Sequence, residues 1–183
     1  EVAYGRTPFV LVSTKPGVEG LSTRDIAEMY AGRLASWPDG QPVRLVLRPA
    51  SDADTALLAE FSPAIKAGLE LALAREGMVV GMTDQEAVDA VERLPGGLGT
   101  ASLALLVSEN RRARPLAIDG VAPTIDNLAS GRYRYMKQMF MVLREDAPPA
   151  AARFAAFVRS EAGRRVLART GHLPVAAPDL AAR

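Results

Sequence analysis

The stretch LVLRPASDADT, residues 45–55, places an apolar strand, one arginine and a helix start in direct succession. Val43–Leu47 is a short apolar run of the kind that forms a buried strand. Arg48 ends that strand, and residues that favour turns and helix caps follow it: Ser51, Asp52, Asp54 and Thr55. Open α/β sheets bind ligands where strands end and helices begin, and a guanidinium there pairs with oxyanions. The stretch therefore predicts a binding pocket for a small polar ligand rather than a site of bond breaking.

The same residues also have structural interpretations. Arg48 could form a salt bridge with a nearby aspartate instead of holding an anion, and at least one of the residues that follow it caps the helix. Asp52 and Asp54 bear on the class of ligand. Ionised carboxylates accept hydrogen bonds and repel anions, so a pocket that contains them prefers a protonated oxyanion, a polyol or a cationic group over a dianion.

Strand and helix patterns alternate along the whole chain. Apolar runs predict strands over Thr7–Ser13, Val43–Leu47, Met78–Met82, Pro115–Ile118 and Met136–Leu143. Helical spacing and capping residues predict helices over 23–33, 54–76 with an interruption at Pro63, 83–93, 102–109, 123–129, 148–159 and 161–170. This alternation is typical of an α/β domain in which helices flank a mostly parallel sheet.

A glycine-rich segment, PGGLGTAS over residues 95–102, follows the third predicted helix. It contains part of a dinucleotide-binding fingerprint, but the third glycine is missing and no solid strand precedes it. We therefore expect a tight loop whose bend exposes Thr100 at a helix start, and Thr100 joins the candidate ligand-binding residues.

Composition argues against several other classes of protein. The 183 residues carry a net charge of +1 without a block of one sign, which argues against a nucleic-acid partner. The sequence has no cysteine and one histidine, His172, so a thiol nucleophile is excluded and a catalytic triad or zinc site is not expected. We predict no enzymatic activity, no cofactor and no metal ion. Glu1 opens no charged-then-apolar leader.

The order of the motifs resembles the phosphate-binding type of substrate-binding protein in bacterial ABC transporters, which has the two-lobed, type 2 periplasmic-binding-protein-like fold. The resemblance covers nearly the whole chain. The stretches that carry it are Leu21–Trp37 (LSTRDIAEMYAGRLASW), Val43–Pro49 (VRLVLRP), Leu94–Thr100 (LPGGLGT), Ile118–Gly131 (IDGVAPTIDNLASG) and Phe154–Pro174.

The resemblance implies a role for each candidate residue. Arg48 matches the arginine that ion-pairs with phosphate in that family. The family's Ser-Gly-Thr run, whose hydroxyls and amides hold phosphate, falls on Asp52, Ala53 and Asp54, so that two carboxylates replace two hydroxyls, while Ser51 and Thr55 flank the run. The expected ligand is phosphate or another small oxyanion, the expected partner is the membrane permease of an ABC transporter, and the expected location is the periplasm.

The resemblance also divides the chain into lobes. Residues 1–13 would form a hinge strand and a remnant of lobe one, residues 14–134 lobe two, and residues 135–183 the return hinge strand and the C-terminal helices of lobe one. The family's opening strand-helix-strand block is missing from this sequence. The helices over 147–183 would then expose an apolar face, so we expect either a fragment or self-association through that face.

Two other functions remain open at this stage. One is a ligand-sensing or adaptor domain of the same fold, which would use the same pocket. The other is a small α/β transferase, which is disfavoured because the sequence offers no recognisable nucleophile–base pair.

Overall fold

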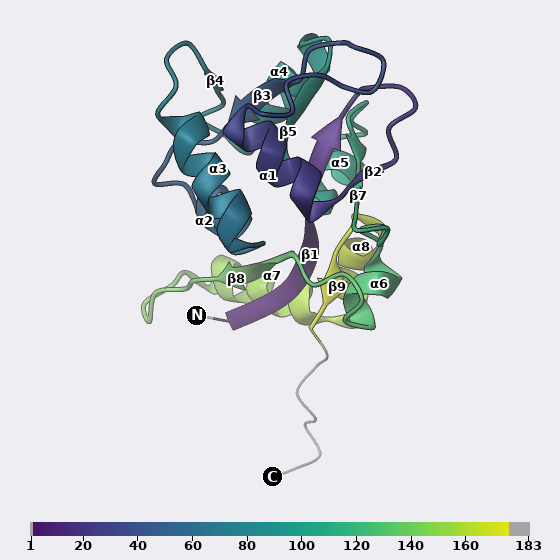
Figure 1. The fold of residues 1–183 in the computed structure, drawn as a ribbon. Coiled ribbons are helices and arrows are strands. Elements are labelled where there is room, and N and C mark those ends of the chain that lie inside the picture. Colours follow the sequence, from purple (N-terminus) through teal and green to yellow (C-terminus); the bar gives the residue numbers. More distant parts are fainter. Residues whose placement is uncertain (1, 176–183) are drawn as a thin grey trace.

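The computed structural model describes residues 2–175 and shows a sheet with helices on both faces (Figure 1). Glu1 and residues 176–183, which end the predicted lobe-one segment, lie outside the described residues. No helix in the described part is both long and apolar enough to cross a membrane. The elements in chain order are β1 (Val2–Ser13), β2 (Gly20–Leu21), α1 (Thr23–Ala31), β3 (Arg44–Leu47), α2 (Ala53–Ala59), α3 (Pro63–Leu73), β4 (Val79–Val80), α4 (Asp84–Arg93), β5 (Gly97–Ser102), α5 (Leu103–Ser108), β6 (Arg114–Pro115), β7 (Ala117–Ile118), α6 (Ile125–Ala129), β8 (Met136–Met141), α7 (Pro149–Arg159), α8 (Glu161–Arg169) and β9 (Leu173–Pro174).

The long strand β1 runs through both parts of the molecule (Figure 1). Its second half lies in a larger body, which contains α1–α5 and β3–β5. Its first half pairs with β8 and β9 in a smaller body, which also contains α7 and α8. Phe9 and Leu11 pack in the core with α1 and α3, whereas Val10 and Val12 pack in the core with α4. The predicted burial of this run on both faces is confirmed, and the strand begins earlier than predicted, at Val2.

The main sheet has the order β4-β3-β5-β1-β6, and β8 and β9 also pair with β1. The α/β class with flanking helices is confirmed, but the sheet is mixed rather than mostly parallel. The strand β3 runs parallel to β4 and β5, whereas β1 is antiparallel to β5, β6, β8 and β9. The antiparallel pairing of β8 follows from the path of the chain, because β1 leaves the smaller body and β8 returns to it alongside.

In the glycine-rich segment only Pro95 and Gly96 form the predicted turn, and Gly97–Ser102 form a buried strand, β5. A Cβ atom at Gly99 would lie 2.8 Å from Val91 Cγ2, and one at Gly97 would lie 2.8 Å from the Val91 carbonyl oxygen. Gly97 and Gly99 are therefore needed because α4 packs directly on this strand, whereas Gly96 lies in the turn before it with a φ of +76°.

The start signals of the helices lie where the sequence predicts them. Ser22 and Thr83 each cap a helix in a capping box, with Asp25 and Glu86 respectively. The predicted helix over 54–76 is interrupted at Pro63, as expected, and forms α2 and α3.

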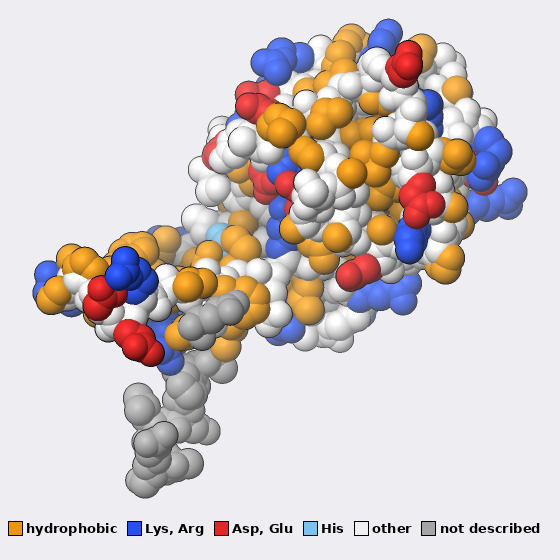
Figure 2. Space-filling view, turned by 90° about the vertical axis from the view of Figure 1, so that its left-hand side faces the viewer, with side chains coloured by type: hydrophobic (Ala, Val, Ile, Leu, Met, Phe, Trp, Pro, Cys, Tyr) orange, Lys and Arg blue, Asp and Glu red, His pale blue; other side chains and the backbone are white. Residues whose placement is uncertain are grey.

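The smaller body exposes several large apolar side chains. Figure 2 shows hydrophobic side chains over this body, and the exposed ones on β8, α7 and α8 include Phe140, Phe154, Phe157 and Val166. On α7, Phe154 is 64% exposed, and none of the residues of this helix is buried. The apolar face predicted for the C-terminal helices is therefore present on this chain.

A hydrogen bond from Tyr133 fastens the segment before β8 to β1. Its buried hydroxyl donates to the carbonyl oxygen of Phe9 at 2.8 Å. We expect Tyr133→Phe to lower the free energy of unfolding by about 1–3 kcal/mol, because a buried carbonyl loses its donor. Tyr135→Phe is the control, since Tyr135 is only partly buried, and it should stay within about 0.5 kcal/mol of the unmodified chain. Urea unfolding followed by circular dichroism measures both, and equal losses would contradict the role of Tyr133.

Candidate ligand-binding site

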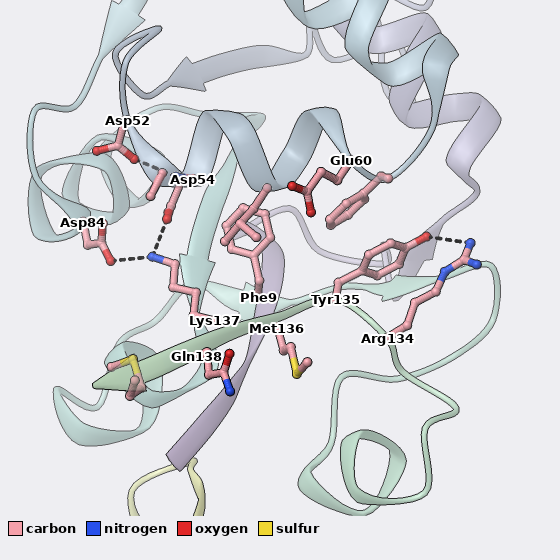
Figure 3. Close-up of a pocket in the computed structure, with 14 residues that line it drawn as sticks. Phe9, Asp52, Asp54, Glu60, Asp84, Arg134, Tyr135, Met136, Lys137 and Gln138 are labelled. Atoms are coloured by element: carbon pink, nitrogen blue, oxygen red, sulfur yellow. Dashed lines mark hydrogen bonds and ion pairs between the residues drawn. The ribbon is translucent and has the colours of Figure 1, made fainter. Parts of the chain in front are cut away.

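A groove of about 730 Å³ lies between α2 and the start of β8 (Figure 3). Its acidic and basic lining residues are Asp52, Asp54, Glu60, Asp84, Arg134 and Lys137. Aromatic rings line it as well: Phe61 stacks on Tyr135 with 3.6 Å between ring centroids, and Phe9 meets Phe61 edge-on at 5.8 Å. The groove thus combines a rigid aromatic wall with a row of charged groups.

Local structure explains how these groups meet. Asp52 caps α2 by accepting a 2.8 Å hydrogen bond from the backbone N–H of Asp54. The helix then presents Asp54 and Leu57, three residues apart, to the groove, and Phe61 follows just after the helix ends. Asp84 opens α4 just after β4, and β4 lies parallel to β3, so Asp84 emerges at the same sheet edge as Arg48. Lys137 extends to these carboxylates from β8 (Figure 3).

The guanidinium of Arg48 is buried and is held by internal partners. Its Nη1 donates to the carbonyl oxygen of Gly81 at 2.8 Å, and its Nη2 lies 2.7 Å from Asp52 Oδ2 and 3.2 Å from Asp84 Oδ1. Arg48 is 7% exposed and does not line the groove. In this structure Arg48 therefore forms salt bridges with aspartates, as the structural interpretation of the sequence expects. The carboxylates of Asp52 and Asp84 line the groove, and the guanidinium that they contact does not.

Lys137 connects the return strand to the two helix starts. Its Nζ lies 2.5 Å from Asp54 Oδ1 and 2.9 Å from Asp84 Oδ2, and it sits 5.7 Å from the centroid of the Phe9 ring. Together with Arg48 and Asp52 these groups form what we call the ion network: Asp52, Arg48, Asp84, Lys137 and Asp54. It ties β3, α2, α4 and β8 together at one point.

The charges that line the groove favour ligands that donate hydrogen bonds over ligands that carry negative charge. Four carboxylates and two cationic side chains line it. Burial raises the pKa of Asp54, and the ammonium of Lys137 acts in the opposite direction. Chemically, the groove can accept hydrogen bonds at several carboxylate oxygens, and it offers positive charge at Lys137 and Arg134. Within residues 2–175 no three side chains of His, Cys, Asp or Glu are grouped to hold a metal ion.

The structure brings four of the six predicted site residues around one small cavity. Arg48, Asp54, Thr55 and Thr100 line a space of about 10 Å³ behind α2. Asp54 also lines the groove, as does Asp52. Ser51 is exposed in the turn before α2 and lines neither space.

The hydroxyl groups of Thr55 and Thr100 lie in environments that the sequence did not indicate. The expectation that Thr100 is exposed at a helix start is wrong: it is 5% exposed and pairs with Leu11, because its segment is the strand β5. Thr55 donates from Oγ1 to the carbonyl oxygen of Pro49 at 2.8 Å, so its hydroxyl holds the turn before α2.

Sequence reasoning missed Asp84, Glu60, Lys137 and Tyr135. For Lys137 a signal existed, because it is a lone lysine in the otherwise apolar or uncharged run 136–143. Asp84 follows the capping residue Thr83 and looks like an ordinary first-turn acid. Only the parallel pairing of β3 with β4 brings Asp84 beside Arg48.

The chain combines a mixed α/β sheet, a strand β1 that leads into a second body, and a polar groove at strand ends. The chain belongs to the PBP superfamily: the PBP superfamily domain matches residues 1–162. A curated relative, "Phosphate-binding protein PstS" from Bacillus subtilis (strain 168), is 24% identical over 173 residues. This alignment covers 90% of the chain but 53% of the relative, so the chain spans about half the length of that curated protein.

Solved structures share the fold. A putative phosphate ABC transporter substrate-binding protein from Clostridium perfringens, with bound phosphate, superposes with a TM-score of 0.79 at 17% identity, over 95% of this chain and 71% of that one. PstS from Borrelia burgdorferi superposes with a TM-score of 0.65 at 13% identity, over 96% of this chain and 72% of that one. The predicted periplasmic-binding-protein-like fold is therefore confirmed.

The raised pKa of Asp54 predicts a pH dependence of stability. Because burial raises this pKa above its ordinary value of 3.8, the contribution of Asp54 to stability is full below pH 3.8 and is lost as the pH rises through the folded-state pKa. The unfolding free energy of the unmodified chain, minus that of Asp54→Asn, should therefore fall as the pH rises above 3.8. Urea unfolding at a series of pH values measures this difference. A difference that grows with pH would mean that the ion pair with Lys137 outweighs burial.

Asp39→Asn is the matched control, because the contribution of Asp39 to the unfolding free energy changes with pH in the opposite direction. A hydrogen bond from Lys15 lowers the pKa of the exposed Asp39 below 3.8. Its contribution is therefore present above pH 3.8 and is lost as the pH falls through the folded-state pKa.

Proposed function

We propose that the chain is the larger part of a solute-binding protein that serves ABC-type uptake of a small oxyanion such as phosphate. The observation that carries this proposal is the groove between α2 and the return strand β8, at strand ends, in a chain of the PBP superfamily. The relatives that the chain resembles are described as phosphate-binding proteins, which supports phosphate as the first solute to test.

Within this proposal the positive charge that faces the solute comes from Lys137 and Arg134, which line the groove. Asp52 and Asp54 accept hydrogen bonds from a protonated oxyanion. Arg48 acts from behind them through its contact with Asp52. Ser51 stays a proposed contact, whereas Thr55 and Thr100 line the small cavity behind α2 and support the site from there. The solute is bound and released without chemical change.

We assign the two bodies to the two lobes of such a protein. Residues 14–134 form lobe two, β1 and β8 act as hinge strands, and α7 and α8 belong to lobe one. The groove faces the junction of the bodies, where closure about the hinge strands would enclose a solute. The partner in transport would be the membrane permease of an ABC transporter, and the location would be the periplasm.

A cationic or polyhydroxylated solute is the second candidate. The specific observation that favours it is the excess of carboxylates over cations among the residues that line the groove. Carboxylates accept hydrogen bonds from ammonium and hydroxyl groups and repel anions.

Calorimetric titration of phosphate into the full-length natural protein tests the primary proposal, with sulfate and molybdate as controls. We expect saturable binding of phosphate that is tighter than about 1 μM, equivalent to about 8 kcal/mol. If none of these oxyanions produces a binding signal, the oxyanion proposal is rejected, and the carboxylates then direct the search to polyols and cationic solutes.

Lys137→Met tests the assignment of the charge that faces the solute. The change removes an ammonium, leaves Asp54 without its cation and leaves Asp84 with Arg48 alone, so both effects weaken anion binding. We expect phosphate affinity to fall by about 1.5–3 kcal/mol, which is about 10- to 150-fold in Kd. Lys66→Met on the exposed side of α3 is the control and should bind as the unmodified protein does. Equal affinities in both variants would remove Lys137 from the site.

The apolar face of β8 and α7 gives a test of the lobe assignment. We propose that the remainder of lobe one covers this face, because the chain spans 53% of the curated relative and leaves Phe140, Phe154 and Phe157 exposed. This chain alone should therefore bind a hydrophobic dye or self-associate in light scattering, and the full-length protein should do neither. If the chain alone is a monodisperse monomer that binds no dye, the assignment fails.

A further inference from the structure

Two buried polar atoms in the ion network have no hydrogen-bond partner among the residues that the structure describes. They are Nε of Arg48, which is a donor, and Oδ2 of Asp54, which is an acceptor. Arg48 is 7% exposed and Asp54 is 3% exposed. Leaving a charged group's polar atom buried without a partner is costly, so both atoms call for a partner in the folded protein.

The two side chains face one small space. The cavity of about 10 Å³ behind α2 is lined by both Arg48 and Asp54, together with Thr55, Thr100 and apolar side chains such as Leu58 and Leu69. A volume of about 10–15 Å³ is what a single water molecule needs. Phosphate is too large for this cavity.

We propose that one internal water molecule occupies this cavity and bridges Arg48 to Asp54. Water suits the two ends chemically, because its oxygen accepts from the Nε–H of Arg48 while one of its hydrogens is donated to Oδ2 of Asp54. A metal cation is disfavoured by the guanidinium, and an anion is disfavoured by the carboxylate. Thr55 already donates its hydroxyl proton to Pro49, so its Oγ1 can accept the second hydrogen of the water.

The water closes a ring of alternating charges. Arg48 contacts Asp84, Asp84 contacts Lys137, and Lys137 contacts Asp54. The bridge from Asp54 through the water returns to Arg48. The ring holds Lys137 in place beside the groove, and it uses the buried atoms Nε of Arg48 and Oδ2 of Asp54, which have no other partner among the described residues. This inference does not depend on which solute the groove binds.

A crystal structure of this chain that resolves individual waters is the first test. We expect one water peak at about 2.7–3.2 Å from both Nε of Arg48 and Oδ2 of Asp54. An empty cavity, or a direct contact between the two side chains, would overturn the proposal.

Nuclear magnetic resonance tests the same water in solution. In isotope-labelled protein the Nε–H signal of Arg48, assigned by its disappearance in Arg48→Lys, should show a rotating-frame Overhauser cross-peak to a long-lived water. Asp54→Leu replaces the carboxylate with an apolar side chain of similar shape and should abolish this cross-peak. Asp52→Asn is the matched control: Asp52 belongs to the ion network but does not line the cavity, so the cross-peak should persist.

Each contrary result is decisive. A cross-peak that is missing in the unmodified chain, that survives in Asp54→Leu or that is lost in Asp52→Asn would overturn the water bridge. Where Asp54→Leu does not fold, the crystal structure of the unmodified chain decides.

Discussion

Burial of the Arg48 guanidinium is the constraint that organises the site. A cation at the end of a buried strand must have carboxylate and carbonyl partners, because leaving one buried charge unpaired costs about 3–5 kcal/mol. The partners come from three places: Asp52 at the start of α2, Asp84 at the start of α4, and the carbonyl oxygen of Gly81 between β4 and α4. Two helix starts are thereby held beside one strand end. Lys137 then joins β8 to the same point, since Asp54 and Asp84 would otherwise present uncompensated negative charge.

The long strand β1 determines where that charged point lies in the molecule. Because it is buried on both faces in the larger body and continues into the smaller one, it makes the two bodies share a strand, and β8 must return beside it. The groove forms where β8 passes α2, so one wall belongs to the larger body and the other to the strand that leaves it. The ion network therefore spans the junction of the two bodies, where the proposed hinge strands run. A solute that altered the pairing of Lys137 would act directly on the connection between α2 and β8.

How much of this could be predicted from the sequence depends on the range of the interactions involved. The two-sided burial of Thr7–Ser13, the capping boxes at Ser22 and Thr83 and the interruption at Pro63 are local, and the sequence predicts them correctly. The strand β5 was missed because its glycines serve packing against Val91, which local turn chemistry cannot reveal. Arg48, Asp52 and Asp54 were recognised as a group, but their partners Asp84 and Lys137 are brought in only by strand pairing. Local pattern thus identifies the candidate residues, and long-range pairing determines which charges surround them.

In the proposed lobe assignment, the charge of the groove has to be considered together with a lobe that would cover it. In the resemblance that the sequence carries, hydroxyls and one arginine meet phosphate, whereas here carboxylates stand at two of those positions and the arginine is paired internally. A half-site with this arrangement binds an oxyanion when the solute brings protons for Asp52 and Asp54 to accept, or when further donors reach it from the other lobe. The same half-site binds a compound with ammonium or hydroxyl groups without additional donors, because such a compound itself donates hydrogen bonds to the carboxylates. In the proposed assignment a covering lobe would decide the ligand as much as the groove does, because the same carboxylates select a protonated anion under a cationic cover and a cation under an acidic one.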